Sequence, residues 1–153
     1  WPFESGSFDA VLCTQVMEHA QDLTNLLDEV QRVLKPGGML VATAPFAYND
    51  HGAPGDYRRF SAHGFREIFS RDYDVLELKR QGGIGRTVGL LLLNWVDASL
   101  NASRATRLIK GGLFPFWVAG STVINAAGWL VDKLDRTNAF YSNVLLLARK
   151  TRS

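Results

Sequence analysis

The sequence predicts an α/β domain, and three stretches near its start carry that prediction. Residues 8–14 (FDAVLCT) form a short, mostly apolar run, which is typical of a strand buried on both faces of a parallel sheet. Residues 22–35 carry apolar side chains at helical spacing, and residues 39–44 (MLVATA) form a second apolar run. Strand, helix and strand therefore follow one another within one parallel crossover, for which a right-handed βαβ unit is expected.

The helix over residues 22–35 has signals at both of its ends. Asp22 is placed to cap its first turn, and the sequence Pro36-Gly37-Gly38 is placed to stop it. Its apolar residues are Leu23, Leu26, Leu27, Val30, Val33 and Leu34.

The remaining elements follow in order along the chain. A polar, aromatic loop over residues 46–60 is long enough to be functional, and a short helix is expected over residues 62–69. Residues 73–79 (YDVLELK) alternate imperfectly, as expected of a strand at a sheet edge. An apolar helical insertion over residues 82–138 then precedes a last strand over residues 143–148 and a basic tail. We expect residues 1–153 to form a single, partial domain.

The composition of the chain argues against some classes of function. The chain has 153 residues, enough for one domain, and its net charge of +2 is small and scattered, so we expect no nucleic-acid partner. Its single cysteine, Cys13, can form no internal disulfide and has no second cysteine with which to share a metal, which fits a reducing, cytoplasmic location. The alternative for Cys13 is a small core residue.

The start of the chain does not have the features of a targeting segment. It begins at Trp1, without an initiator Met and without a basic stretch leading into an apolar run. We therefore expect the sequence to be a piece of a longer protein.

Several motifs at fixed intervals in residues 2–45 resemble one known family. They are Pro2-Phe3, Ser7-Phe8-Asp9 opening a strand, Glu18-His19 after it, and Leu34-Lys35-Pro36-Gly37-Gly38 before the next strand. This block resembles the centre of class I S-adenosylmethionine-dependent methyltransferases that act on small molecules. A later stretch, with His51, Pro54, Asp56-Tyr57 and Arg58, is similar to a loop found in one subgroup.

The resemblance implies the last four strands of a seven-stranded, Rossmann-like sheet that ends in an antiparallel hairpin. It implies S-adenosylmethionine as the cofactor and methylation of a small molecule, including lipid-linked and sugar-linked acceptors. The glycine-rich turn and the acidic residue that grip the cofactor in such folds belong to the three earlier strands, which this sequence lacks.

Site residues follow from the same resemblance. Groups just after the strand at residues 8–14 lie beside the methionine part of the cofactor in that family, so Cys13, Thr14 and Gln15 are the predicted cofactor contacts. For Gln15 the alternative is that its amide satisfies loop backbone. Glu18 and His19 are the predicted catalytic residues, with His19 as a general base oriented by a carboxylate. The alternative is that this pair only holds the loop together.

A metal site is not expected. Some members of the family bind a divalent cation through Glu-x-x-Glu-His, but here the first position is Gln15. An amide in place of a carboxylate removes a negative charge that a hard cation favours.

The loop over residues 46–60 is the predicted cover of the acceptor, with Tyr48, His51, Tyr57 and Arg58 as substrate contacts. Arg58 would suit an anionic substrate. Its alternative is an ion pair with Asp56.

Residues 82–89 (GGIGRTVG) nearly match the G-x-G-x-x-G pattern of dinucleotide-binding turns. The last glycine comes one residue late, so we favour a turn into a packed helix over a nucleotide-dependent dehydrogenase.

The insertion allows three interpretations. Residues 111–131 contain no charge and are about as long as a membrane-spanning helix, which needs ~20 residues, but glycines and polar side chains dilute their hydropathy. Peripheral membrane contact through residues 84–131, with Trp95, Trp117 and Trp129 as anchors, is a second interpretation. Packing in a core or against a protein partner is the third.

The whole sequence thus predicts an enzyme that transfers a methyl group. Its rival is a non-catalytic remnant that serves as a partner- or membrane-binding module. Without the earlier strands, the strand around Val11 would have an open edge, through which a homodimer could form.

Overall fold

The computed structural model describes residues 1–151, so Arg152 and Ser153 of the predicted tail lie outside the described residues. The chain divides into two compact units. One contains residues 1–81 together with the segment from Asn143 onward, and the other contains Gly82–Ser142. Each is described by itself.

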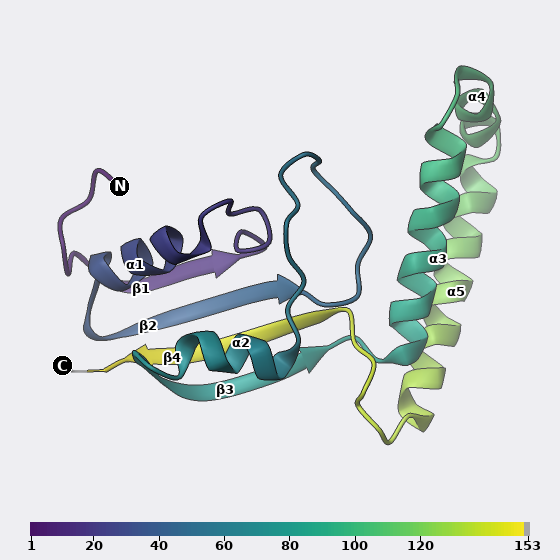
Figure 1. Cartoon of the computed structure of the whole chain (residues 1–153). Helices are drawn as coiled ribbons and strands as arrows, with labels where there is room; N and C mark the ends of the chain where they lie inside the picture. The colour runs from purple at the N-terminus through teal and green to yellow at the C-terminus, as the bar shows by residue number, and fades with distance from the viewer. Residues whose placement is uncertain (152–153) are drawn as a thin grey trace. The chain divides into compact units, whose positions relative to one another are not determined.

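The first unit is built on a four-stranded sheet (Figure 1). Its strands, in spatial order, are β1 (Phe8–Thr14), β2 (Leu34–Pro45), β4 (Asn143–Lys150) and β3 (Tyr73–Gln81). β1 and β2 are parallel, whereas β4 is antiparallel to both of its neighbours. The four predicted strands, the antiparallel end of the sheet and the edge position of β3 are confirmed.

Helix α1 (Leu23–Val33) connects β1 to β2 and starts where the sequence predicts. The Asp22 carboxylate accepts a hydrogen bond of 2.9 Å from the N–H of Asn25. The helix ends two residues before the predicted Lys35, because Leu34 already has extended backbone and begins β2. Gly37 then turns the chain at a φ of 77°, a conformation that glycine adopts at little cost.

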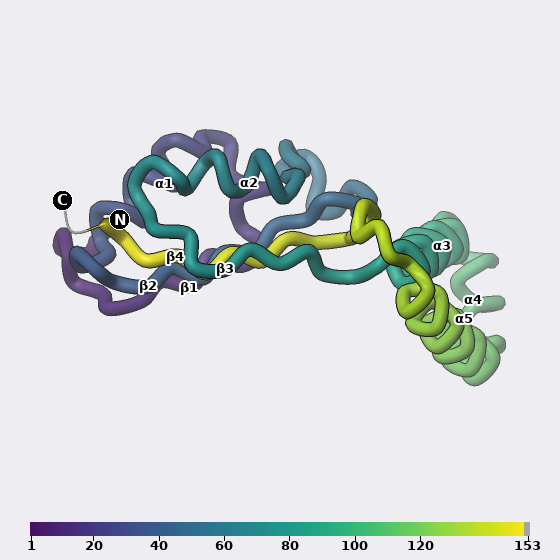
Figure 2. Tube along the Cα trace, turned by 90° about the horizontal axis from the view of Figure 1, so that it is seen from below, coloured from purple at the N-terminus to yellow at the C-terminus, as the bar shows by residue number. Residues whose placement is uncertain are grey.

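Helix α2 (Ala62–Phe69) lies on the same face of the sheet as α1 (Figure 2). Ser61 caps it by accepting a hydrogen bond from the N–H of Gly64. Its buried aromatic rings continue an edge-to-face series that runs from one end of the helix to the next strand. That series consists of Phe60, Phe65, Phe69 and Tyr73.

The opposite face of the sheet carries no helix of the first unit (Figure 2). Along β1, Cys13 is buried while Leu12 is 74% exposed and Phe8 is 37% exposed. The prediction that β1 is buried on both faces is therefore wrong for the described chain. β1 forms one edge of the sheet, and only one of its faces lies under α1 and α2.

The second unit consists of helices α3 (Ile84–Asn101), α4 (Arg104–Gly112) and α5 (Phe114–Leu134). Gly85 lies against Gly128 and Gly89 lies against Ile124, so α3 and α5 run antiparallel, with α4 between them in the chain. α5 is long and apolar enough to cross a membrane by length and composition, and only 6% of its apolar window is buried.

Candidate functional site

The carboxyl ends of β1 and β2 lie side by side, as those of parallel neighbours do. Directly after β1 the backbone turns at Gln15, whose φ is 53°, and the Gln15 N–H donates to the carbonyl of Thr43 at 3.0 Å. In open α/β sheets this is the end at which ligands bind. The predicted site residues around the end of β1 and in the loop after β2 therefore belong to one corner of the molecule.

The Gln15 amide joins a polar chain across the strand ends. Its Nε2 donates to Thr43 Oγ1 at 3.1 Å and to Asn143 Oδ1 at 3.0 Å, and the Asn143 amide donates to Gln81 Oε1 at 2.8 Å. Gln15 thus has a structural role, because this chain of hydrogen bonds links the ends of all four strands. Its bonds go to side chains as well as to the backbone of Thr43. Its contact with the cofactor stays a prediction.

Thr14 and Cys13 end β1 with opposite orientations. Thr14 is exposed, whereas the Cys13 thiol is buried on the side of α1 and α2. Burial, and secondarily the nearby Glu18 carboxylate, raise the pKa of Cys13 to about 11. A cofactor contact by Cys13 would have to use its backbone.

Glu18 is fully buried, and among residues 1–151 its two carboxylate oxygens have no hydrogen-bond partner. The side chain of His19 lies close, with its Nε2 atom 3.9 Å from Glu18 Oε1. The backbone of Glu18 is fixed, because its carbonyl accepts from the N–H of Tyr57 at 2.8 Å. Burying a carboxylate without hydrogen bonds costs several kcal/mol, so a group held in this way indicates a functional site.

His19 and His51 face each other beside Glu18. Their Nε2 atoms are 3.2 Å apart, and their rings meet edge to face with centroids 4.7 Å apart. Nδ1 of His19 lies 2.5 Å from the carbonyl oxygen of Gly55, and Nδ1 of His51 lies 3.2 Å from the carboxylate of Asp56. The predicted substrate residue Tyr48 packs edge to face on the other side of His51, at 5.0 Å between centroids.

The two Nδ1 atoms both face oxygen atoms, those of the Gly55 carbonyl and the Asp56 carboxylate. An N–H at each Nδ1 would satisfy these contacts and leave the Nε2 atoms, which face each other beside Glu18, as the nitrogens available to a proton or a cation.

A divalent cation would fit between Glu18, His19 and His51. Glu18, His19 and His51 each offer one ligand atom, and these atoms lie within 4.8 Å of one another. Imidazole nitrogens suit divalent transition metals, and metal-bound histidines usually donate their other N–H to a carboxylate or carbonyl, as both do here. The prediction of no metal site rested on Gln15, and the sequence spacing gave no sign of His51 as a third ligand.

Asp56 and Arg59 hold the loop that carries His51. The Asp56 carboxylate is 3% exposed and accepts from Arg59 Nη1 at 2.5 Å, from Arg59 Nη2 at 2.7 Å and from the N–H of His51 at 2.9 Å. The Arg59 guanidinium, aided by the His51 N–H, lowers the pKa of Asp56 far below its usual range despite burial. Nothing in the sequence spacing marks Arg59 as part of the site.

Arg58 has a different set of partners from the one considered for it. Its guanidinium donates to the carbonyl oxygens of Ala20 and Gln21, which tie the loop to the segment after β1. The alternative of an ion pair between Arg58 and Asp56 is wrong, because Asp56 pairs with Arg59. Substrate contact by Arg58 and by the half-exposed Tyr57 stays a prediction.

The glycine-rich turn at residues 82–89 already holds an anion from its own unit. Asp132 accepts from the N–H groups of Gly83 at 3.3 Å and Gly85 at 2.7 Å, and from Arg86 Nε at 2.5 Å. The carboxylate thus takes the place at the start of α3 that a phosphate would need. The interpretation as a turn into a packed helix agrees with this geometry, and the dehydrogenase interpretation does not.

Comparison with known proteins agrees with the order and direction of the strands. Residues 1–42 match the family model described as a methyltransferase domain. The chain has a class I methyltransferase fold. A ubiquinone biosynthesis O-methyltransferase of Xanthomonas oryzae pv. oryzae is 49% identical over 37 residues, which cover 24% of this chain and 16% of that protein.

Solved structures show the methyltransferase fold over the whole chain. The cyclase SpnF aligns over 100% of this chain and 53% of its own, with a TM-score of 0.56 and 17% identity. Phosphoethanolamine N-methyltransferase 2 of Haemonchus contortus, solved with S-adenosyl-L-methionine, aligns over 100% of this chain and 35% of its own, with a TM-score of 0.51 and 19% identity. The methyltransferase fold seen here thus spans about half or less of these structures. Because a cyclase shares the fold, the chemistry has to be argued from the site.

Proposed function

We propose that this chain carries the acceptor side of an S-adenosylmethionine-dependent methyltransferase that methylates a hydroxyl group of a small molecule. The observation that carries the proposal is the convergence of Glu18, His19 and His51 beside the ends of β1 and β2. The family-model match over residues 1–42 supports the class of reaction.

The end of β1 fits part of the cofactor. Thr14 is exposed there, and the turn at Gln15 leaves the strand end open on that side. Thr14 and the backbone of Gln15 are the groups of this chain that would contact S-adenosylmethionine. When bound, the cofactor supplies an activated methyl group, so the protein has to align the acceptor, exclude water and remove a proton.

The histidine pair suits the removal of that proton. With Nδ1 of each ring turned to an acceptor oxygen, an Nε2 atom is left to accept the proton of an acceptor hydroxyl. Asp56 orients His51 and the Gly55 carbonyl orients His19, so the free Nε2 points to the same place each time. The buried Glu18 carboxylate stabilises the positive charge that then forms on the rings.

A hydroxyl is the proposed acceptor because a base is of use mainly where a proton must be lost. The name of the Xanthomonas oryzae relative, an O-methyltransferase, points the same way. Tyr48, beside His51, and Tyr57, whose N–H holds Glu18, would line the acceptor.

Calorimetric titration with S-adenosylhomocysteine tests the cofactor part of the proposal. We expect micromolar binding, about −8 kcal/mol, when the chain is joined to the strands that carry the glycine-rich turn, and much weaker binding by residues 1–153 alone. No heat from the longer protein, in a sample that circular dichroism shows to be folded, would support a non-catalytic module instead.

A matched pair of histidine variants tests the role of the site. His19→Gln should lower the rate of S-adenosylhomocysteine release in the presence of small hydroxyl compounds by about 10²- to 10⁴-fold, with cofactor affinity unchanged. His63→Gln alters an exposed histidine on α2 and should change neither. Equal rates for both variants would remove His19 from the chemistry. Activity lost with EDTA and restored by Mn²⁺ or Zn²⁺ would show that the three residues act by holding a cation.

A further inference from the structure

The helical unit Gly82–Ser142 exposes far more apolar surface than a water-soluble helical pair needs. Many large apolar side chains of α3 and α5 are at least one third exposed. Those from α3 are Val88, Leu91, Leu92 and Trp95, and those from α5 include Phe116, Val118, Val123, Leu130, Val131 and Leu134. Contiguous apolar patches of this kind mark a binding surface.

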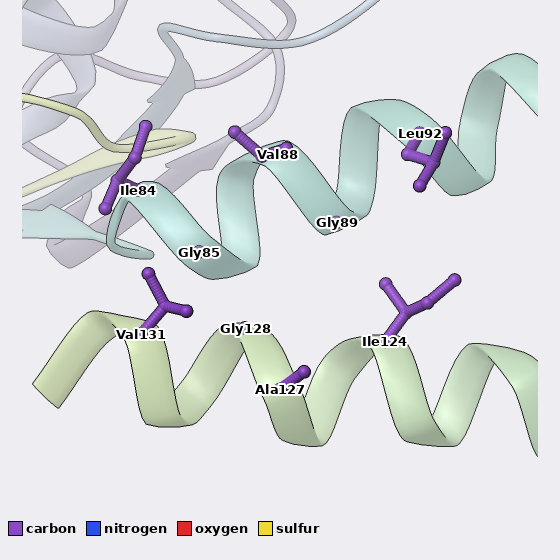
Figure 3. A pocket seen from close by; sticks show the side chains of 9 residues that line it. All are labelled: Ile84, Gly85, Val88, Gly89, Leu92, Ile124, Ala127, Gly128 and Val131. Atoms are coloured by element: carbon purple, nitrogen blue, oxygen red, sulfur yellow. The ribbon is translucent and has the colours of Figure 1, made fainter.

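Many of the apolar side chains lie on one side of the helical pair. An open groove of about 330 Å³ runs between α3 and α5 on that side (Figure 3). Its walls are apolar and include Ile84, Val88 and Leu92 from α3 and Ile124, Ala127 and Val131 from α5. Trp95 and Leu134 each stand three residues beyond a lining residue, so helical geometry places them on the same side, whereas Val123 and Leu130 lie on its flank.

Polar residues lie away from the groove on α3 and, in part, on α5. On α3, helical spacing places Arg86, Asn94 and Asp97 away from the groove. On α5 it does the same for Thr122, but the exposed side chains of Val118 and Trp129 share that side. α3 therefore has an apolar side and a polar side, whereas α5 is apolar around most of its surface.

The polar side chains in the middle of α5 are satisfied within the helix. Ser121 and Thr122 donate to the carbonyl of Val118, each at 2.9 Å, and Asn125 donates to the carbonyl of Ser121 at 2.8 Å. Ser121 lies nearest of the three to the groove, and its bond to the preceding turn lets its hydroxyl sit in an apolar medium without an unpaired donor.

The helices meet through small residues, as helices in membranes often do. Gly85 and Gly89 form a G-x-x-x-G pattern on α3, and Gly85 touches the backbone of Gly128 on α5. The contact depends on close backbone approach and leaves the larger apolar side chains on the outside.

The charges of the unit favour an anionic partner. Residues 82–142 contain six basic and three acidic residues. Two of the acidic residues, Asp97 and Asp132, pair with Lys110 and Arg86 inside the unit. Among residues 1–151, the other basic residues form no ion pair with a carboxylate, and they stand at the ends of the helices. They are Arg104, Arg107, Lys133 and Arg136.

The length of the uncharged segments argues for lying on a bilayer rather than crossing it. α5 has 21 residues and would be about 31 Å long, close to the hydrocarbon thickness. On α3, however, the uncharged stretch between Arg86 and Asp97 would span only about 15 Å. The two helices cannot both cross, whereas a pair lying in the interface keeps all charges near water.

We infer that the unit Gly82–Ser142 binds peripherally to the surface of a lipid bilayer with anionic headgroups. The groove side enters the acyl region, Trp95 sits at its boundary, and the basic residues at the helix ends meet the headgroups. The inference does not depend on the proposed methyl transfer.

Vesicle sedimentation of the whole chain tests the inference. We expect binding to phosphatidylcholine vesicles that contain phosphatidylglycerol, and about tenfold weaker binding to phosphatidylcholine alone or at 0.5 M NaCl. Val131→Glu, in the wall of the groove, and Leu134→Glu, one turn further along α5, should each weaken binding about tenfold or more.

Thr122→Glu and Ala126→Glu are the matched controls, because they add the same charge to exposed positions on the opposite side of the same helix. They should change binding less than threefold. Equal losses for the two sets, or no binding of folded wild type to either vesicle, would overturn the inference. So would analytical ultracentrifugation showing that the groove side closes on a second copy and that the dimer ignores vesicles.

Discussion

The thiol of Cys13 is buried near the end of β1, close to the Glu18 carboxylate of the proposed site. With a pKa of about 11, only a small fraction of it is ionised near neutral pH. We expect it to react with iodoacetamide at pH 8 at least ~100-fold more slowly than a free thiol of pKa ~8.5, and at the normal rate in denaturant. Labelling of the native chain at the free-thiol rate would show that Cys13 is accessible and that the end of β1 opens.

Asp56 is the residue on which the position of His51 depends most. Asp56→Asn leaves the partly buried Arg59 without its carboxylate, so we expect the free energy of unfolding to fall by about 1–3 kcal/mol in urea titration. Asp50→Asn is the matched control, because Asp50 approaches the same Arg59 at 3.8 Å but is 95% exposed. It should cost about 0.5 kcal/mol or less, and equal costs would contradict the importance given to the buried pair.

At the scale of elements, the contact between α3 and α5 depends on two glycines. An added methyl group at Gly85 would overlap the carbonyl of Gly128 and come within 2.8 Å of Val131 Cβ, whereas one at Gly120 meets nothing within 4 Å. We expect Gly85→Ala to destabilise the chain by about 1–3 kcal/mol and Gly120→Ala to stabilise it by about 0.5–1 kcal/mol. Neither change lowers helix propensity, so a loss of stability at Gly85 measured by urea titration reports the packing effect, and a shift of the same sign in both would refute it.

The start of α3 depends on the ionised form of Asp132. Burial alone would raise the pKa of Asp132, but hydrogen bonds from Arg86 and from the N–H groups of Arg86 and Gly85 outweigh it and lower the pKa. A lowered carboxyl pKa gives stability that is present above about pH 4, the unfolded value, and is lost as pH falls through the folded value.

Between pH 6 and pH 3 the unfolding midpoint of the wild type should therefore fall further than that of Asp132→Asn. The variant starts lower because a neutral amide holds the N–H groups less well. If the unfolding midpoints of the two proteins, measured by circular dichroism, fell in parallel with pH, the charge of Asp132 would not contribute to stability.

At the scale of the whole molecule, local pattern predicted the elements well. Phe8–Thr14 and Ala62–Phe69 have the predicted bounds, and the start of α1 follows from its cap. These features depend on residues within one or two turns of each other, which the sequence shows directly.

Features that depend on residues far apart in the chain could not be predicted as well from the sequence. The exposure of β1 depends on what covers the sheet, and apolar content alone does not give that. The pairing of His19 with His51 spans 32 residues and depends on the path of a loop, and the bond from Gly83 to Asp132 spans 49. Loop paths and long-range partners are set by tertiary contacts, so the sequence could supply the candidates but not their pairing.

The two ends of the helical unit lie together, since a Cβ on Gly82 would be 2.6 Å from Ser142 Oγ. β3 and β4 are hydrogen-bonded neighbours although the whole unit separates them in the chain. Closing so long a connection costs entropy, unless the intervening segment has already folded and brought its ends into register. In folding, the unit therefore does for β3 and β4 what a short turn does for a hairpin. We expect the helices to form before β4 pairs with β3.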